Sequence, residues 1–443
     1  MNGAAARMLE AVRGADWVRR IGRITRFVGL TVESQGPDAQ LGELCNIVSG
    51  VDGVTTLAEV VGFSGSRLLL MPYEDPVGIR IGSEVIATGR SAQIRAGEHL
   101  LGRVIDGFGA PLDDRALAVG GTPCSIYPPP INPLHRGLVC EVLETGIRAV
   151  DSLLTLARGQ RIGIFAGSGV GKSTVLGMIA REAKADVSVI ALVGERGREV
   201  RSFVENGLSA AARARSVVVA ATSDQPPLVR RRAAFLATAI AEYFRDRGLH
   251  VCLTMDSVTR VAMAQREIGL ASGELPTARG YTPSVFALLP RLLERGGVRA
   301  QGGSLTALYT VLVEGDDLED PISDSVRSIL DGHIVLSRAI AQRGRYPAVD
   351  VTQSVSRLAS SIVSEPDNRL MSEVTRLLAL YETSRDLIEV GAYKPGSNGE
   401  IDRALRLVPQ FEKFLAQKAA EVERRSAAME RLRKILEEPV RAA

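Results

Sequence analysis

The chain has 443 residues, more than one hydrophobic core usually serves, so we expect about two or three domains. Hydrophobic residues make up 45% and charged residues 24% of the sequence, which is typical of a globular protein and excludes a disordered one. The formal net charge of +3 is small for this length and gives no general indication of a nucleic-acid-binding face.

The cysteines and the hydropathy pattern indicate a protein of a reducing compartment. The cysteines are widely separated and form none of the close pairs of zinc or redox motifs, so we interpret them as free thiols. They are Cys45, Cys124, Cys140 and Cys252. No apolar run approaches the roughly 18 residues of a membrane-spanning helix, and the amino terminus lacks the apolar core of a secretory signal. We therefore expect a cytoplasmic protein.

The first elements in chain order are a terminal segment and a β-rich region. Residues 1–20 could form a short helix with Met8, Leu9 and Val12 on one side, and a frayed terminus is the open alternative. Residues 21–95 contain short β-branched runs separated by Gly, Asp and Pro, a spacing that predicts a small antiparallel barrel or sandwich. The Gly- and Pro-rich stretch that follows, over residues 99–136, predicts a linker packed along a surface.

The central region predicts a doubly wound α/β core. Between about residues 146 and 356, near-continuous apolar runs of strand length alternate with helical stretches, as expected for parallel strands that are buried on both faces. The runs are RIGIFA, VSVIAL, SVVVAA, HVCLTMD and LTALYTVL.

The carboxy-terminal region predicts helices. Met371, Val374, Leu378 and Tyr381 share one face at helical spacing. A second apolar stripe, with Phe411, Phe414 and Leu415, lies in the segment from Pro409 to Leu436. We interpret both stripes as packing within a helical domain.

A glycine-rich motif follows the RIGIFA run and begins a helical stretch, the context of a phosphate-binding loop. Its glycines let backbone N–H groups point inward at a helix amino terminus, where an anion is favoured. Lys172 would reach the β- and γ-phosphates and the Ser173 hydroxyl would bind Mg²⁺. The general pattern begins with Gly, where this sequence has Ala166. The candidate nucleotide-binding residues are Ala166, Gly167, Ser168, Gly169, Val170, Gly171, Lys172, Ser173 and Thr174.

Two carboxylates complete the predicted site. Asp256 ends the HVCLTMD run, where a carboxylate can hold the hydration shell of Mg²⁺ opposite the phosphate loop. Glu195 follows the VSVIALVG run, and the carboxyl ends of parallel strands meet at one edge of a sheet. Glu195 can therefore orient the attacking water, although GER alone also fits a surface turn.

Taken together, the motifs resemble those of the rotary ATP synthase superfamily. They are AGSGVGKST, LVGERGREV, TMDSVTR, GELPTARGYTPSVFALLPRLLERGG, EGDDLEDPISDSVRSILDGHIVLSR and RYPAVDVTQSVSR. Within it, the chain most resembles the ATPases of flagellar type III protein export. That resemblance implies a homohexameric ring, a stator-binding segment (1–20), a β-barrel (21–95), a P-loop core with its linker (96–360) and a helical domain (361–443).

The resemblance also implies roles for individual residues. Glu195 matches the carboxylate that polarises the lytic water, and Arg260 matches a phosphate-contacting arginine. Tyr346 matches an aromatic residue against the adenine, with a core aromatic as the alternative, and Tyr393 is a further candidate beside the base. Arg357 matches the arginine finger that one subunit inserts into its neighbour's site, with a surface ion pair as the alternative.

The implied partners are other copies of the chain, a stator-type regulator, a central coiled-coil stalk, the export gate, and export substrates with their chaperones. The implied location is peripheral, at the inner-membrane export apparatus. The finger and the glutamate lie on one chain, which suits a ring of identical catalytic subunits.

Other functions stay open. A virulence injectisome ATPase would share all these motifs. An RNA-dependent ring helicase would need stacking aromatics, and the β-rich region has only Phe27, Phe63 and Tyr73. A non-catalytic ring subunit would lack Glu195.

Overall fold

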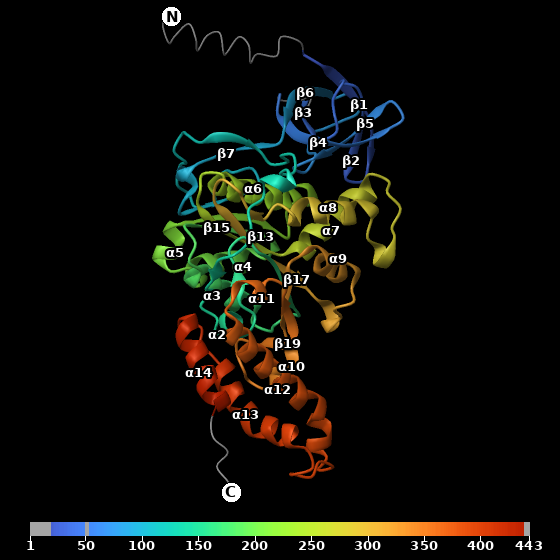
Figure 1. Cartoon of the computed structure of the whole chain (residues 1–443). Helices are drawn as coiled ribbons and strands as arrows, with labels where there is room; N and C mark the ends of the chain where they lie inside the picture. Colours follow the sequence, from blue (N-terminus) through green and yellow to red (C-terminus); the bar gives the residue numbers. More distant parts are fainter. Residues whose placement is uncertain (1–18, 49–52, 438–443) are drawn as a thin grey trace, which may run out of the picture. The chain divides into compact units, whose positions relative to one another are not determined.

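Figure 1 shows the computed structural model of the chain, which describes residues 19–48 and 53–437. The amino-terminal helix predicted around Met8, Leu9 and Val12 lies outside the described residues. The chain divides into two compact units. The first comprises residues 1–93, 226–229 and 264–284, and the second comprises 94–225, 230–263 and 285–443.

The first unit contains a closed barrel, one of the two forms that the sequence predicted. The strands pair antiparallel in the order β1-β2-β5-β4-β3-β6. Alternate side chains fill the interior, as the two-residue period of a strand requires. The strands are β1 (Ile21–Val28), β2 (Thr31–Gln35), β3 (Glu43–Val48), β4 (Thr55–Ser64), β5 (Arg67–Pro72) and β6 (Glu84–Ser91).

The second unit is built on a sheet of nine strands, with the order β19-β18-β12-β17-β15-β13-β14-β8 and β16 beside β17. Its central pairs are parallel, whereas β19 and β16 run antiparallel to their neighbours. The predicted doubly wound core is confirmed. The strands are β8 (Arg103–Ile105), β12 (Arg161–Ala166), β13 (Val187–Glu195), β14 (Ser216–Thr222), β15 (His250–Asp256), β16 (Gly297–Val298), β17 (Ser304–Leu312), β18 (Gly332–Leu336) and β19 (Val349–Ser356).

Helices connect these strands, as a parallel sheet requires. They are α2 (Arg148–Leu153), α3 (Lys172–Glu182), α4 (Gly197–Ser202), α5 (Ala210–Ala214), α6 (Pro227–Arg245), α7 (Val258–Ala271), α8 (Pro283–Leu293), α9 (Pro321–Ile329), α10 (Arg338–Gln342) and α11 (Ala359–Ile362). The part of the chain that the structure describes has no helix both long and apolar enough to span a bilayer.

The predicted linker over residues 99–136 contributes to the sheet. Its segment β8 pairs in parallel with β14, through Val104 and Val218 among others. Short strands β7 (Gln93–Ala96) and β9 (Thr122–Ser125) form a separate pair, as do β10 (Val142–Leu143) and β11 (Leu156–Ala157). The linker prediction is therefore wrong for β8, which is an edge strand of the core.

The carboxy-terminal part of the second unit is helical, as predicted. It consists of α12 (Glu365–Glu389), α13 (Gly399–Leu415) and α14 (Arg425–Glu437), which follow one another at the red end of the chain in Figure 1. Val374 and Phe411 are fully buried between them, so the apolar stripes do serve packing. The stripe from Pro409 to Leu436 is however two helices, separated by residues 416–424.

The cysteines are free thiols, as predicted. Cys45 lies inside the barrel and Cys252 in the sheet, both buried, whereas Cys140 is exposed.

Candidate active site

The glycine-rich loop lies between β12 and α3, where the sequence placed it. Ala166 is still part of β12 and pairs with Leu312 and Leu336, so alanine fits at a position where the general motif has glycine. Gly169 and Gly171 have φ angles of 80° and 92°, a left-handed conformation that side chains rarely adopt. The loop thus reaches the amino terminus of α3 with its backbone turned as an anion site requires.

At position 167 glycine is required because two side chains pack closely against its Cα. A Cβ there would lie 2.5 Å from Oδ1 of Asp316 and 3.1 Å from Nη2 of Arg338. These two side chains form an ion pair at 3.2 Å, beside a cavity of about 270 Å³ that borders the loop. The sequence did not predict this pair, because Asp316 and Arg338 lie at opposite ends of one long motif and only the fold brings them together.

Lys172, Glu195 and Asp256 come together at the carboxyl edge of the sheet. The ammonium Nζ of Lys172 lies 2.6 Å from Oδ1 of Asp256 and 3.3 Å from Oε1 of Glu195. All three side chains are nearly buried: Lys172 and Glu195 are each 12% exposed, and Asp256 is 6% exposed. The sequence predicted that these residues share an edge, and the structure confirms their proximity.

Thr310 is a member of this cluster that the sequence did not predict. Its hydroxyl on β17 donates a hydrogen bond of 2.7 Å to the same Oδ1 of Asp256. Thr310 is one of two buried threonines in the largely apolar run LTALYTVL, which pairs with the strand that ends in Asp256. Hydroxyls in a buried strand are a signal that the sequence does give, because buried polar groups need partners, but it does not tell which of the two threonines faces Asp256.

Burial raises the pKa of both carboxylates. For Asp256, loss of solvent raises the pKa, and the Lys172 charge opposes that rise. For Glu195, loss of solvent and a hydrogen bond with Glu199 raise the pKa, again against Lys172. The Lys172 charge therefore favours the ionised form of both carboxylates. Their combined negative charge would in turn favour the binding of a metal cation.

The donor set fits Mg²⁺. Asp256 and the exposed Ser173 on the first turn of α3 offer hard oxygen ligands. Among the described residues there is no group of three or more His, Cys, Asp or Glu side chains suited to a metal. A cation with few protein ligands, completed by phosphate oxygens and water, is the usual arrangement for Mg²⁺ in nucleotide sites.

Arg260 lies against the strand that carries Glu195. Gly194 has a φ angle of 72°, and a Cβ there would meet the Arg260 side chain at 2.8 to 3.3 Å. The arginine stem thus packs across Gly194, the residue before the catalytic candidate. Within the described part of the chain, its buried Nε has no hydrogen-bond partner, so it can still donate to a phosphate.

Tyr346 lies beside the phosphate loop. Two of its ring carbons are 3.6 Å from the point where a Gly171 Cβ would stand, and the residue is 47% exposed. The alternative of a core aromatic is therefore wrong. Tyr393 donates a hydrogen bond of 2.8 Å to Asp402, in the connection between α12 and α13, and the structure gives it no contact with the loop.

Arg357 does not join the cluster of its own chain. Arg357 follows Ser356, the last residue of β19, which pairs with Gly332 at the start of β18. The phosphate loop begins after Ala166, which pairs with Leu336 at the end of β18. The two therefore lie at opposite ends of β18. The Arg357 guanidinium donates a weak hydrogen bond of 3.3 Å to the Arg327 carbonyl, and within the described residues it forms no ion pair. The ion-pair alternative is wrong, and the guanidinium is exposed at the opposite edge of the sheet.

Family comparisons agree with this geometry. The ATP synthase alpha/beta family model for the nucleotide-binding domain matches residues 146–356, and its beta-barrel model matches residues 24–89. The model for the T3SS EscN ATPase C-terminal domain matches residues 363–434.

Individual relatives cover almost the whole chain. The "Flagellum-specific ATP synthase" of Bacillus subtilis (strain 168) is 54% identical, over 93% of this chain and 94% of the relative. The assembled ATPase EscN of the enteropathogenic E. coli type III secretion system has a TM-score of 0.89 at 43% identity, and covers 94% of this chain and 100% of its own.

EscN in complex with its central stalk EscO has a TM-score of 0.85 at 42% identity, with the same coverage of both chains. Barrel, P-loop core and helical domain thus match relatives throughout. The chain belongs to the ATP synthase alpha/beta family, in the branch of the flagellum-specific and type III secretion ATPases.

Proposed function

We propose that the chain hydrolyses Mg-ATP as a ring of identical subunits and energises flagellar type III protein export. The observation that carries the proposal is the cluster of Lys172, Glu195 and Asp256 at one edge of the sheet, with Arg357 exposed at the other. A ring brings opposite edges of neighbouring subunits together, so each site would receive its finger from the next chain.

Each residue has a separate task in this proposal. The loop residues and Lys172 bind the phosphates, Ser173 and Asp256 hold Mg²⁺, and Mg²⁺ when bound would neutralise charge on the phosphates. Glu195 orients the attacking water and accepts its proton. Arg260 contacts the phosphates from beside Gly194.

Tyr346 would meet the adenine, because its exposed ring lies next to the amino terminus of α3. Arg357 of one subunit would stabilise the charge that develops on the γ-phosphate of its neighbour's nucleotide.

The identities favour the flagellar branch, at 54% for the Bacillus subtilis relative against 49% for the "Type 3 secretion system ATPase" of Xanthomonas euvesicatoria. The assembled EscN and its stalk EscO support a homohexameric ring around a central coiled-coil stalk in this protein. Export gate, substrates with chaperones, and a peripheral position at the inner membrane would follow from the same role. A complementation experiment separates the two branches, since a flagellar ATPase should restore hook-protein export to a strain that lacks its own.

Replacing Lys172 with alanine tests the phosphate site. The change removes the ammonium that pairs with Glu195 and Asp256 and leaves two largely buried carboxylates facing the phosphates, so Mg-ATP affinity should fall about a hundredfold. The measurement is nucleotide binding, with Lys184→Ala as the control, because Lys184 pairs with Glu144 outside the site. Wild-type affinity in the Lys172 variant would overturn the assignment of the loop.

Removing residues 1–18 tests the proposed stator-binding segment. This cut keeps Arg20, whose Nη2 lies 3.0 Å from Oε1 of Glu43 in the barrel. Basal ATP turnover should stay within about twofold of that of the full chain, because the active-site residues lie in the other compact unit. Pull-down of the stator-type regulator should weaken strongly, and full retention would return the segment to the frayed-terminus interpretation.

A further inference from the structure

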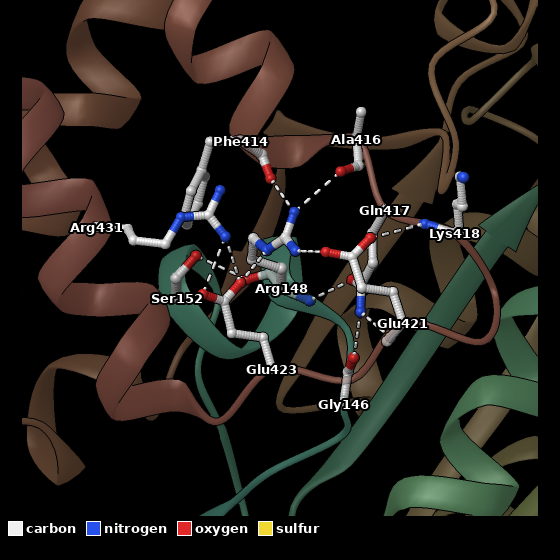
Figure 2. A network of polar contacts seen from close by, with 10 residues as sticks. All are labelled: Gly146, Arg148, Ser152, Phe414, Ala416, Gln417, Lys418, Glu421, Glu423 and Arg431. Atoms are coloured by element: carbon white, nitrogen blue, oxygen red, sulfur yellow. Dashed lines mark hydrogen bonds and ion pairs between the residues drawn. The ribbon is translucent and has the colours of Figure 1, made fainter.

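A buried arginine at the start of α2 holds the segment between α13 and α14 (residues 416–424, here called the α13–α14 turn). Arg148 is only 2% exposed, and Figure 2 shows its guanidinium surrounded by this turn. Its Nη1 donates hydrogen bonds of 2.7 Å to the Phe414 carbonyl and 2.9 Å to the Ala416 carbonyl. Its other nitrogens pair with the carboxylates of Glu421 and Glu423.

Gln417, within the turn, links the same region of α2 to Tyr346. Its side-chain oxygen accepts from the backbone N–H of Arg148 at 2.8 Å, and its side-chain nitrogen donates to the Gly146 carbonyl at 2.8 Å. Its own backbone N–H donates to the Tyr346 carbonyl at 2.8 Å. One buried glutamine thus bonds both the start of α2 and the residue beside the phosphate loop.

Packing of the helical domain explains only part of this arrangement. The ion pairs of Arg148 hold the bundle to the core, but the bundle would not need Gln417 to bond Tyr346. The Tyr346 ring is half exposed, so side-chain packing does little to fix its position. The position of the ring therefore depends on how its main chain is held. Gln417 bonds the Tyr346 carbonyl, and the preceding residue, Arg345, has its Nε 2.7 Å from Oε2 of Glu412 on α13.

We propose that Arg148 and Gln417 are positioning residues for nucleotide binding, which act through Tyr346. Arg148 orders the α13–α14 turn, Gln417 transmits that order to the Tyr346 backbone, and the ring is held where a base meets it. The proposal rests on the base-binding role of Tyr346 given above. Binding to a preformed site avoids the entropy cost of ordering it. Loosening the link from Arg148 through Gln417 to Tyr346 should therefore weaken the contribution of the base to nucleotide affinity and leave that of the phosphates unchanged.

The test compares Mg-ATP with Mg-tripolyphosphate, which has the phosphates but no base. In the full-length Gln417→Ala protein, the KM for ATP should rise about tenfold, while kcat at saturating ATP stays within about twofold. The inhibition constant of tripolyphosphate as a competitor should not change. Arg148→Lys should act in the same direction, because a single ammonium cannot replace a guanidinium that bonds two carbonyls and two carboxylates.

A matched control is Arg403→Lys, which alters an ion pair with Glu373 in the same helical bundle but outside the turn. It should leave both affinities unchanged. If Arg148→Lys fails to fold, Gln417→Ala still decides, because it removes no charge. Equal losses for ATP and tripolyphosphate, or the same selective loss in the control, would overturn the positioning role.

Tyr346→Ala separates failure of this inference from failure of the proposed base contact. By itself it should weaken ATP and spare tripolyphosphate, and Gln417→Ala should add no further loss in that background. If Tyr346→Ala is selective and Gln417→Ala is not, the link through Gln417 is wrong and the base contact stands. If Tyr346→Ala leaves ATP affinity unchanged, the base contact is wrong and the inference falls with it.

Discussion

Glu195→Gln should reduce ATP turnover by about three orders of magnitude while Mg-ATP still binds. The amide keeps the shape of the carboxylate and can still lie near Nζ of Lys172, which is 3.3 Å from Oε1 in the native site. It cannot accept a proton from water, and removal of a general base costs about 10² to 10⁴ in rate, with more where charge stabilisation is lost as well. Single-turnover hydrolysis and equilibrium nucleotide binding, measured on the same preparation, separate the two effects.

The control for this change is another glutamate of the region that follows β13. Glu205 is half exposed and pairs at 2.9 Å with Arg201, one helical turn away on the surface. Glu205→Gln should keep turnover within about twofold, because exposed pairs of this kind contribute little. Unchanged turnover in Glu195→Gln would show that another group serves the water, and loss of binding would show that Glu195 holds the nucleotide instead.

Much of the catalytic core could be predicted from the sequence because its strands are buried on both faces. A run such as RIGIFA has no polar face, so it reads as a strand of a parallel sheet without knowledge of its partners. Once these strands are placed, their carboxyl ends put the phosphate loop, Glu195 and Asp256 on one edge. The proximity of these groups therefore followed from local pattern and from one rule of sheet topology.

The elements that the sequence did not predict depend on distant partners. Strand β8 is three residues long and exists because β14 offers it an edge, more than a hundred residues later. Strand β3 contains Glu43 and Asn46, and only its place in the barrel reveals the alternation of its side chains.

The break between α13 and α14 follows the same logic. The sequence predicted one helical segment from Pro409 to Leu436, but Arg148 binds the Phe414 and Ala416 carbonyls at the end of α13. A helix carbonyl that bonds a guanidinium has found its partner outside the helix, and the chain can turn there. The sequence near residue 416 therefore does not predict this break, because the arginine that causes it lies about 270 positions earlier in the chain.

Mixing two inactive variants should restore ATPase activity if Arg357 acts on the neighbouring subunit. Lys172→Ala and Arg357→Ala each damage a different side of the same interface, because Arg357 lies at the sheet edge opposite the phosphate loop. An interface that pairs the intact loop of one variant with the intact finger of the other is complete. Random one-to-one mixing in a head-to-tail ring gives about one quarter of interfaces this composition.

Whether ATPase activity returns on mixing is more informative than how much of it returns. Coupling between sites around the ring can hold activity below one quarter of the wild-type value, whereas a finger acting within its own chain would give none at all. The matched control mixes Lys172→Ala with the double variant Lys172→Ala/Arg357→Ala, a combination that contains no intact loop and should stay inactive. If mixed rings of the two single variants form, as native mass spectrometry can verify, and turnover does not exceed that of either parent, Arg357 is not a finger in trans.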